Sequence, residues 1–281
     1  PGGAANAAVN VASLGGRAIM IGVAGRDEPG DMLIDSLDTM SVDPANISRS
    51  PGIRTTTKVR VLAGQHYAAR QQVIRIDYEN GAPLAEDLRA ELRNALSSAA
   101  GIADAIIISD YNYGAVFPEI IEDALSISGK RGIPLVVDSR YRLKELADAT
   151  TATPNREEVE QILGANFTAE QCSQLREELG LKALLVTNGN QGMSLFEAGR
   201  SEVRIPAVGA LEPVDVTGAG DTVIAAYALA LASGLNFEEA ANVANHAGGI
   251  VVMKKGTAAA FAHELVTSLA GEPGPLSSHA K

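Results

Sequence analysis

After Pro83 the sequence alternates short, almost wholly apolar runs with longer stretches whose apolar residues recur at helical spacing. The apolar runs predict buried strands at 105–108, 135–137, 151–153 and 183–187. The intervening stretches predict helices at 84–98 and 119–128, and two more that start after Pro154-Asn155 and after Thr168. Strands that alternate with helices are typical of a mostly parallel sheet with helices on both faces. The sequence therefore predicts an α/β fold.

The other regular elements are predicted on either side of this alternation. An Ala-rich helix at 4–14 stops at Gly15-Gly16 and is followed by a buried strand at 17–23 and a helix at 31–40. Residues 193–196 and 203–205 predict a strand pair near the sheet edge, and helices are expected at 222–233, 237–252 and 259–269. We expect residues 1–270 to form one domain and the polar residues 271–281 to form a tail or linker.

Between residues 55 and 79 the hydrophobic period changes to two, which is typical of strands. Thr57, Val59 and Val61 alternate with more polar residues in the first half of this stretch. After a turn near Gly64, a second run places its apolar residues on one face in the same way. The pattern predicts a β-ribbon that stands apart from the main body.

The chain is acidic and contains a single cysteine. Its 281 residues include 23 Lys and Arg against 34 Asp and Glu, which gives a formal net charge of −11. Because no cluster of Lys and Arg is present, we do not expect it to bind nucleic acid, whose phosphates require a basic face. Cys172 alone can form no internal disulfide, so a reducing compartment, the cytoplasm, is expected. The sequence contains no run of about 18 apolar residues, so no membrane span is predicted.

The most specific motif is Asp-Val-Thr-Gly-Ala-Gly-Asp-Thr at 215–222, which leads directly into an Ala-rich helix. Its small residues allow a sharp turn that brings the N–H groups of Gly218, Ala219 and Gly220 together at a helix N-terminus, where an anion is stabilised. Asp221 lies at the same entrance, placed to take a proton from an attacking hydroxyl while the amides stabilise a transferred phosphoryl group. The alternative is an Asp that only caps the helix after a glycine turn.

Other nucleotide and hydrolase motifs are absent from the sequence. No G-x-x-x-x-G-K-[ST] is present, so a P-loop enzyme is excluded. A dinucleotide-binding motif would need a third glycine at position 223, which is Val223. A nucleophile elbow, G-x-S-x-G, is also missing, and the four histidines are scattered along the chain.

The motif at 215–222 resembles the C-terminal signature of the PfkB, or ribokinase-like, carbohydrate kinases. Gly2-Gly3-Ala4-Ala5-Asn6, with Gly15-Gly16 and Gly25 downstream, is similar to the N-terminal signature of the same family. The resemblance implies a ribokinase-like fold in which the β-ribbon is a lid over the sugar. It also implies phosphoryl transfer from ATP with Mg²⁺, with Asp221 as the base and the amides of Gly218, Ala219 and Gly220 as the anion hole.

Further matches to the family imply how ATP and its cations are held. Asn155 and Glu158 are similar to an N-x-x-E element that positions Mg²⁺, here through water. Asp215 would contribute to a site for a monovalent cation such as K⁺. The residues with an implied nucleotide contact are Thr187, Asn188, Gly189, Gly192, Asn245, Lys255 and Gly256. The residues alone also fit simpler roles, a helix cap with a solvated Glu158 and ordinary turns at 187–189 and 255–257.

Within the family, the chain most resembles the heptose 7-phosphate kinase branch of lipopolysaccharide core synthesis. The matching segments are 55–60, 75–79, 109–111, 153–155 and 191–193. The implied sugar contacts are Gly3, Asn6 and Asp110, and the implied contacts to the substrate phosphate are Lys58 and Arg75. From the residues alone, Lys58 fits a solvated charge on the lid equally well.

Three features depart from the pattern of this branch. Tyr113 stands where the branch usually has Lys, and Asp138-Ser139-Arg140-Tyr141 stands where it usually has Asp-Pro-Lys-Gly. Arg140 could still pair with a phosphate, although Arg and Lys are not interchangeable at such sites. Members also normally carry a strand and an acidic sugar-binding segment before the first signature, so we expect one strand of the central sheet to be missing here.

We therefore expect ATP-dependent phosphorylation of a sugar or sugar phosphate, with heptose 7-phosphate as the favoured substrate. The alternatives are a family kinase acting on ribose, fructose, a keto-deoxy sugar or a nucleoside, and a non-catalytic module that only binds nucleotide or sugar. Kinases of this branch can also be fused to a nucleotidyltransferase, and 271–281 would then be a linker. Exposed edges of the lid would allow a homodimer to form.

Overall fold

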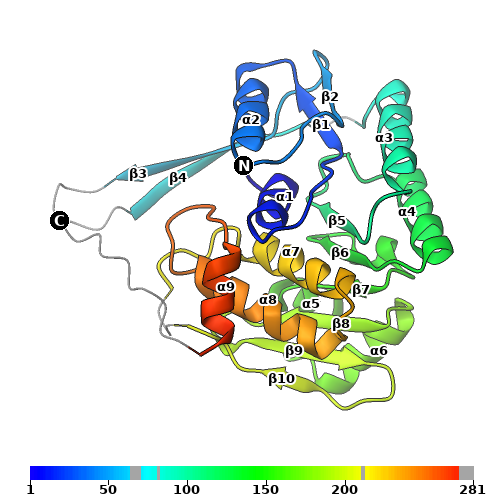
Figure 1. Cartoon of the computed structure of the whole chain (residues 1–281), viewed down its shortest axis with the longest axis vertical. Helices are drawn as coiled ribbons and strands as arrows, with labels where there is room; N and C mark the ends of the chain where they lie inside the picture. The colour runs from blue at the N-terminus through cyan, green and yellow to red at the C-terminus, as the bar shows by residue number, and fades with distance from the viewer. Residues whose placement is uncertain (64–70, 81–82, 210–212, 272–281) are drawn as a thin grey trace.

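The computed structural model describes residues 1–63, 71–80, 83–209 and 213–271. Its main sheet has six strands in the order β10-β9-β8-β7-β6-β5 (Figure 1). Four of them run parallel to one another: β5 (Ile106–Asp110), β6 (Leu135–Ser139), β7 (Thr151–Ala152) and β8 (Ala183–Thr187). The antiparallel strands β9 (Met193–Glu197) and β10 (Val203–Ile205) complete one edge. Each of the six overlaps a range predicted from the sequence.

The two faces of the sheet follow from the alternation of side chains along each strand. Val136 and Leu185 point to the face covered by α7 (Ala219–Ala232) and α8 (Phe237–Val251). Val137 and Leu184 join the core on the opposite face, which is covered by α4 (Pro118–Arg131), α5 (Arg156–Leu163) and α6 (Ala169–Glu178). Three more helices pack beside these: α1 (Ala4–Ser13) against α7, α9 (Ala262–Leu269) against α8, and α3 (Glu86–Ala99) against α4. The predicted α/β class is thus confirmed.

The start of α7 differs from the prediction in a way that affects the motif at 215–222. The helix begins at Ala219, earlier than the predicted residue 222, and Gly218 is its N-cap with a φ of 81°. Ala219, Gly220 and Asp221 therefore form its first turn, where backbone N–H groups have no acceptor within the helix. The glycine turn is short enough that the helical hydrogen-bond pattern starts within the motif. At the other end of the chain, α9 starts at Ala262 and not at 259.

A second sheet contains only the parallel strands β1 (Gly22–Gly25) and β2 (Ile47–Ser50), which flank α2 (Glu28–Thr39). The strand predicted at 17–23 is wrong in its bounds, because residues before 22 have no extended strand partner and Ile19 makes only an isolated bridge to Asp43. β2 was not predicted, since its sequence Ile-Ser-Arg-Ser shows no apolar alternation.

A cavity of about 1910 Å³ separates β5 from residues 15–23 and extends to the N-terminus of α7. On the side facing this cavity, β5 has no strand partner in the part of the chain that the structure describes. The expected missing strand of the central sheet stays a prediction. Within the same described ranges, no helix is long and apolar enough to cross a membrane.

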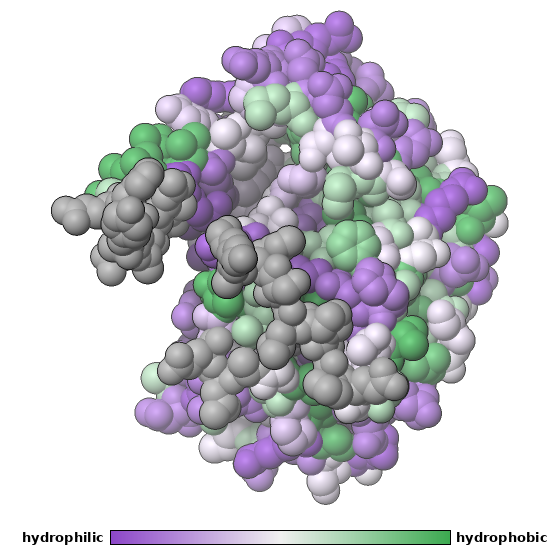
Figure 2. Space-filling view, turned by 60° about the vertical axis from the view of Figure 1, so that its left-hand side comes forward, coloured by the Kyte–Doolittle hydropathy of each residue, from purple (hydrophilic) through white to green (hydrophobic). Residues whose placement is uncertain are grey.

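The predicted ribbon is formed by β3 (Thr57–Ala63) and β4 (Gln71–Tyr78), which pair antiparallel and project from the main body (Figure 1). Val59 pairs with Ile76 and Val61 with Ile74, so these four side chains share one face, and each is at least 40% exposed. Figure 2 shows apolar side chains gathered on the projecting ribbon.

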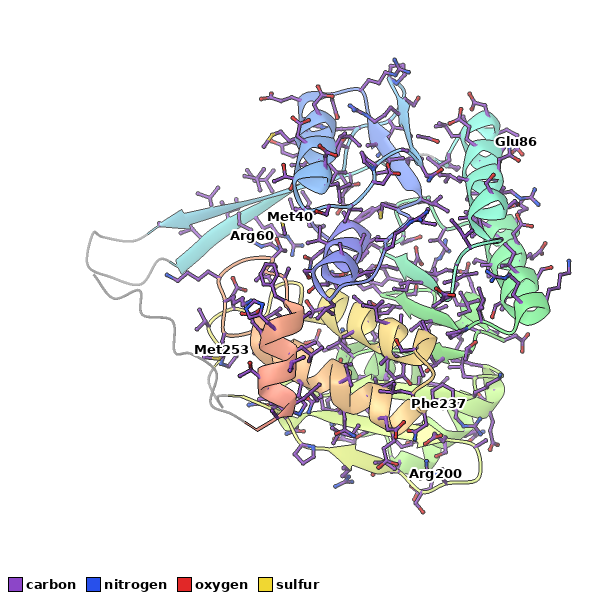
Figure 3. All side chains as sticks on the ribbon, viewed as in Figure 1. Met40, Arg60, Glu86, Arg200, Phe237 and Met253 are labelled. Atoms are coloured by element: carbon purple, nitrogen blue, oxygen red, sulfur yellow. The ribbon has the colours of Figure 1, made fainter. Side chains whose placement is uncertain are left out.

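The polar face of the ribbon carries Lys58 opposite Asp77 and Arg60 opposite Arg75. Lys58, Arg60 and Arg75 line the cavity, and Figure 3 shows Arg60 on the side where the ribbon joins the main body. The turn predicted near Gly64 and nearly all of the predicted tail at 271–281 lie outside the described residues.

Candidate active site

Several polar residues predicted to bind substrate, Mg²⁺ or nucleotide lie together at the carboxyl ends of the parallel strands. Asp110 ends β5 opposite Ser139 at the end of β6, and Asn155 bridges to Thr187 at the end of β8. Because these strands are parallel, their carboxyl ends lie along one edge of the sheet, which is where α/β proteins commonly bind ligands. This edge and the first turn of α7 enclose the candidate site.

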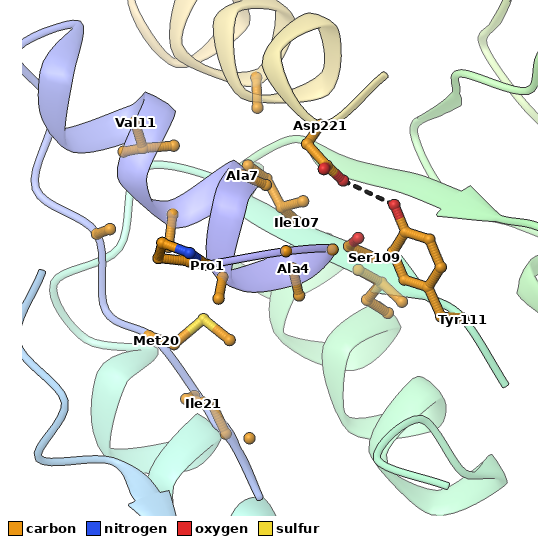
Figure 4. A pocket seen from close by; sticks show the side chains of 18 of the residues that line it. Pro1, Ala4, Ala7, Val11, Met20, Ile21, Ile107, Ser109, Tyr111 and Asp221 are labelled. Carbon is orange, nitrogen blue, oxygen red and sulfur yellow. Dashed lines mark hydrogen bonds between the residues drawn. The ribbon is translucent and has the colours of Figure 1, made fainter. Parts of the chain in front are cut away.

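Asp221 is the centre of the site and is 4% exposed. The Tyr111 hydroxyl donates to Asp221 Oδ1 at 2.7 Å (Figure 4), and Asn6 Nδ2 donates to Oδ2 at 3.0 Å. Burial raises the pKa of Asp221 to about 6, against the two hydrogen bonds, which lower it. A carboxylate with this pKa is ionised at neutral pH and can accept a proton from a nearby hydroxyl.

The amides predicted as an anion hole lie beside this carboxylate. The Ala219 N–H already donates to the Val216 carbonyl at 3.2 Å. The N–H groups of Gly218 and Gly220 have no acceptor within the described residues. Gly220 is exposed, and a Cβ there would meet no atom within 4 Å outside the neighbouring backbone of its own helix. Two of the three predicted amides therefore remain available to an anion at the positive end of α7.

Several carboxylates crowd the same edge of the sheet. Burial, followed by the charges of Glu158, Asp221 and Asp110, raises the pKa of Asp138 to about 8. Burial also raises the pKa of Glu158, although its hydrogen bond from the Asn155 N–H lowers it. The concentration of negative charge favours a cation at this position.

The residues predicted to place Mg²⁺ hold each other. Asn155 Oδ1 accepts from the Glu158 N–H and Glu158 Oε2 accepts from the Asn155 N–H, each at 2.9 Å, which forms a capping box at the start of α5. In the described ranges, no group of three or more His, Cys, Asp or Glu side chains is arranged to hold a metal ion directly. Oxygen donors that are already hydrogen-bonded fit a hard cation that keeps its waters, as Mg²⁺ does, and do not form a closed protein cage.

Of the three predicted sugar contacts, Asn6 and Asp110 are buried and hydrogen-bonded within the protein. Asn6 Nδ2 donates to Asp221 and also to the Gly218 carbonyl at 3.3 Å. Asp110 Oδ1 accepts from the Asn112 N–H at 2.9 Å, and Oδ2 accepts from the Ser139 hydroxyl at 2.8 Å. The guanidinium Nε of Arg142 lies 3.3 Å from the same Oδ2. These contacts join the ends of β5 and β6.

The predicted phosphate contacts have acidic partners on the ribbon itself. Lys58 Nζ lies 3.0 Å from both Asp77 and Glu79, and Arg75 lies 2.9 Å from Asp77. The pKa of Lys58 is raised overall. Partial burial lowers it, but hydrogen bonds to Tyr113, Glu79 and Asp77 raise it by more, so the ammonium stays charged. Arg140 is exposed and also lines the cavity. The predicted residues that line this one cavity are Gly3, Lys58, Arg75, Asp110, Arg140, Gly218 and Asp221.

The predicted nucleotide contacts are not among the residues that line this cavity; they lie at the end of β8, in the turn at 188–192 and the bend at 255–256, and on α8. Asn188 donates to the Ser194 hydroxyl at 3.2 Å, and Asn245 donates to the Pro206 carbonyl at 2.7 Å. Gly192 has a φ of 87°, and a Cβ there would lie 2.0 Å from the Ile205 carbonyl oxygen, so the turn requires glycine. Gly189 begins the short turn after β8, and Lys255 is exposed.

Asp215, predicted to contribute to a cation site, joins two loops. Its Oδ1 accepts from the Thr217 N–H and its Oδ2 from the Gly256 N–H, each at 2.9 Å. Hydrogen bonds from Thr217, opposed by burial, lower the pKa of Asp215. The carboxylate therefore stays ionised and links the glycine motif to residues 254–257.

A family model for pfkB family carbohydrate kinases matches residues 1–264. The chain belongs to this family. It is 38% identical over 285 residues to the bifunctional protein HldE of Caulobacter vibrioides and 41% identical over 283 residues to HldE of Shewanella piezotolerans. These alignments cover 98% and 96% of the chain but 57% and 55% of the relatives, so the chain spans about half the length of the curated proteins it matches.

Solved structures show that the fold is ribokinase-like. Arabidopsis thaliana ribokinase complexed with ribose and ATP gives a TM-score of 0.72 at 24% identity, covering 94% of this chain and 86% of that one. A putative ribokinase II from Escherichia coli in complex with ATP and Mg²⁺ gives 0.75 at 22% identity, covering 97% and 89%. The fold class predicted from the sequence is thereby confirmed, while the roles of individual site residues stay predictions.

Two side chains that the structure places in the site had no role predicted from the sequence. Tyr111 contacts Asp221, and Arg142 contacts Asp110. Both contacts join segments that are distant in the chain, so no local pattern marks them.

The raised pKa of Asp138 makes the stability of the protein depend on pH. The folded chain keeps a proton on Asp138 up to about pH 8, whereas the unfolded chain releases it near the ordinary pKa of 3.8. Stability is therefore lost as the pH rises between these values. Asp138→Asn should remove that loss, so its Tm should exceed that of the parent by a margin that grows from pH 5 to pH 8 in Mg²⁺-free buffer.

The matched control is Asp104→Asn, which changes an exposed carboxylate between α3 and β5. Its Tm should follow that of the parent at every pH. A difference for Asp138→Asn that stays constant with pH would show that the folded protein does not hold this proton.

Proposed function

We propose that this chain is an ATP-dependent kinase that transfers the γ-phosphate of ATP to a hydroxyl of a sugar phosphate, with heptose 7-phosphate as the substrate. The observation that carries the proposal is that buried Asp221 and the available N–H groups of Gly218 and Gly220 lie together at the start of α7. A base and an anion site at one point are the two elements that phosphoryl transfer to a hydroxyl needs from the protein.

In the proposed reaction Asp221 accepts the proton of the attacking hydroxyl. The N–H groups of Gly218 and Gly220, with the dipole of α7, stabilise the negative charge on the transferred phosphoryl group. Mg²⁺, held through water by Asn155 and Glu158, would supply charge neutralisation when bound. The ribbon covers the sugar side of the site and excludes water, which limits transfer to water.

Support for a substrate that carries a phosphate comes from the polar face of the ribbon. Lys58, Arg60 and Arg75 line the cavity that Asp221 also lines, so cations and base face one space. Resemblance to the heptose 7-phosphate kinase branch, together with the HldE relatives, favours heptose 7-phosphate. We assign Lys58 and Arg75 to the phosphate, with Arg140 as a further contact, and Gly3, Asn6 and Asp110 to the sugar side of the site.

The remaining assignments complete the proposal. Asp215 would support a K⁺ site beside the nucleotide, and residues 1–270 would form one kinase domain, acting in the cytoplasm. The acidic chain, with its charge of −11, is not expected to bind nucleic acid. The segments proposed to contact the nucleotide are Thr187, Asn188, Gly189, Gly192, Asn245, Lys255 and Gly256.

Asp221→Asn should abolish turnover because the amide cannot accept the proton. We expect the rate of ADP release in the presence of sugar phosphate to fall at least about 10³-fold. Binding of Mg-ATP, measured as a rise in Tm, should survive, since the N–H groups of α7 remain. Asp104→Asn is the control and should keep full activity; retained turnover in Asp221→Asn would remove this residue from the mechanism.

Lys58→Met should weaken binding of the sugar phosphate while leaving ATP binding unchanged. Loss of one charge-assisted hydrogen bond predicts a KM for heptose 7-phosphate raised about 10- to 100-fold. The measurement is ADP release with heptose 7-phosphate, ribose, fructose, a keto-deoxy sugar and a nucleoside, for the parent and the variant. Lys130→Met, on the exposed last turn of α4, is the matched control.

The outcome of that panel decides between the kinase specificities. A parent that responds only to an unphosphorylated sugar or a nucleoside would contradict the proposed substrate. A parent that binds ATP and releases no ADP with any member of the panel would contradict the proposed catalysis.

A homodimer is proposed through the apolar face of the ribbon. Val59, Val61, Ile74 and Ile76 are exposed together on that face, and a second ribbon would cover them. Ile76→Lys should convert a dimer to a monomer in sedimentation experiments, because a charge would be buried at the contact. Val266→Lys, at an exposed position on α9, should leave the mass unchanged; a parent that sediments as a monomer would refute the dimer.

A further inference from the structure

Tyr111 follows β5 and reaches the carboxylate of Asp221, which lies 110 positions further along the chain. Its hydroxyl donates to Oδ1 at 2.7 Å (Figure 4). The backbone beside Tyr111 is fixed, because Asp110 accepts a hydrogen bond from the Asn112 N–H and pairs with the end of β6 through Ser139. The tyrosine therefore reaches the site from a rigid position at the sheet edge.

The ring of Tyr111 also packs against the start of α1. Gly3, the N-cap of α1, has a φ of 55°, and a Cβ there would lie 3.0 Å from Tyr111 Cε2 and 3.3 Å from Cδ2. A side chain at position 3 would thus push the ring out of place in addition to straining the backbone. The absence of a side chain at Gly3 leaves room for the ring at the distance that its hydroxyl needs to reach Asp221.

The two carboxylate oxygens of Asp221 are held from opposite sides. Tyr111 donates to Oδ1 and Asn6, one turn into α1, donates to Oδ2. Each carboxylate oxygen can accept two hydrogen bonds, so each keeps capacity for a substrate hydroxyl. The terminal torsion of an Asp side chain has broad minima, and two donors fixed in space restrict it to one plane.

We propose that Tyr111 is a positioning residue for phosphoryl transfer, whose hydroxyl, braced by Gly3, holds the Asp221 carboxylate in the orientation that meets the acceptor hydroxyl. This inference rests on the proposed function of Asp221 as the base. It adds a requirement that the glycine motif does not contain, because the orienting group comes from the segment after β5.

The charges around Asp221 explain why such a donor matters. Tyr111 on the β5 side and Asn6 on α1 contact Asp221 directly. The negative charges of Asp221, Asp110 and Glu158 act together on Asp138 at the end of β6, and those of Asp221, Asp138 and Glu158 act on Tyr111. Arg140 lies near Glu158. Burial raises the pKa of Asp221, and the hydrogen bonds from Asn6 and Tyr111 lower it. Without the Tyr111 hydroxyl, the carboxylate of Asp221 would be less firmly oriented and its pKa would be higher.

The test is Tyr111→Phe in the full chain, which removes one oxygen atom and keeps the ring against Gly3. We expect kcat for the sugar phosphate to fall about 10- to 100-fold at neutral pH, with little change in the KM for ATP. The acid limb of the kcat profile should move to higher pH, so that the loss is larger at pH 6 than at pH 9. Tyr227→Phe is the control, because it removes another buried hydroxyl, 3.4 Å from Thr151, away from the site.

Three results would overturn the proposal. A loss that is equal at all pH values would indicate a structural role, and unchanged kinetics would indicate no role. A lower KM for the sugar phosphate with unchanged kcat would indicate that the hydroxyl merely occupies the place of the acceptor. Should Tyr111→Phe fail to fold, Gly3→Ala, which displaces the ring, should show the same shift of the acid limb, and a wild-type profile there would equally refute the proposal.

Asp221→Asn, measured in parallel, separates this inference from the proposed function. Turnover in Asp221→Asn would refute the base itself. An inactive Asp221→Asn together with a Tyr111→Phe that behaves as the parent does would refute only the role of Tyr111.

Discussion

The buried carboxylate of Asp221 is the constraint on which the rest of the site depends. A charge removed from water is costly unless donors replace the lost hydration. The replacements come from Asn6 and Tyr111, which lie 215 and 110 positions away in the sequence, and both approach from well-anchored elements. The site is therefore assembled only when α1, the end of β5 and the start of α7 are all packed together, which ties catalytic competence to the complete fold.

The parallel sheet that assembles these elements also concentrates negative charge. Asp110, Asp138 and Glu158 all lie at the carboxyl ends of strands or just beyond them. The three carboxyl groups are stabilised differently. Asp110 contacts the Ser139 hydroxyl, Arg142 and a backbone N–H, and Glu158 is held in a capping box. The pKa of Asp138 is raised instead, so this group keeps its proton. Of these three, Asp138 has no side-chain hydrogen-bond partner in the part of the chain that the structure describes, so its carboxyl responds most directly to a cation or to pH.

Local patterns were enough to predict the alternating strands and helices, the ribbon, and the glycine turn before α7. They marked Asp221 and the amides as candidates because a turn, a helix start and a carboxylate are adjacent in sequence. They failed where partners are distant: the bounds of β1 depend on β2, whose sequence has no strand pattern. The contacts of Tyr111 with Gly3 and Asp221, and of Arg142 with Asp110, could not be predicted for the same reason.

The ribbon shows how one simple alternation serves two purposes. Its apolar positions form one exposed face, and its charged positions form the face that lines the cavity. The cations on that face are paired with Asp77 and Glu79 of the same ribbon. In the proposed reaction, a phosphate arriving at Lys58 would compete with Asp77 and Glu79 for the ammonium, so the loss of these partners offsets part of the attraction between the charges. Selection among ligands at such a face would then depend also on geometry, on how well a phosphate and its sugar fit between the ribbon and Asp221.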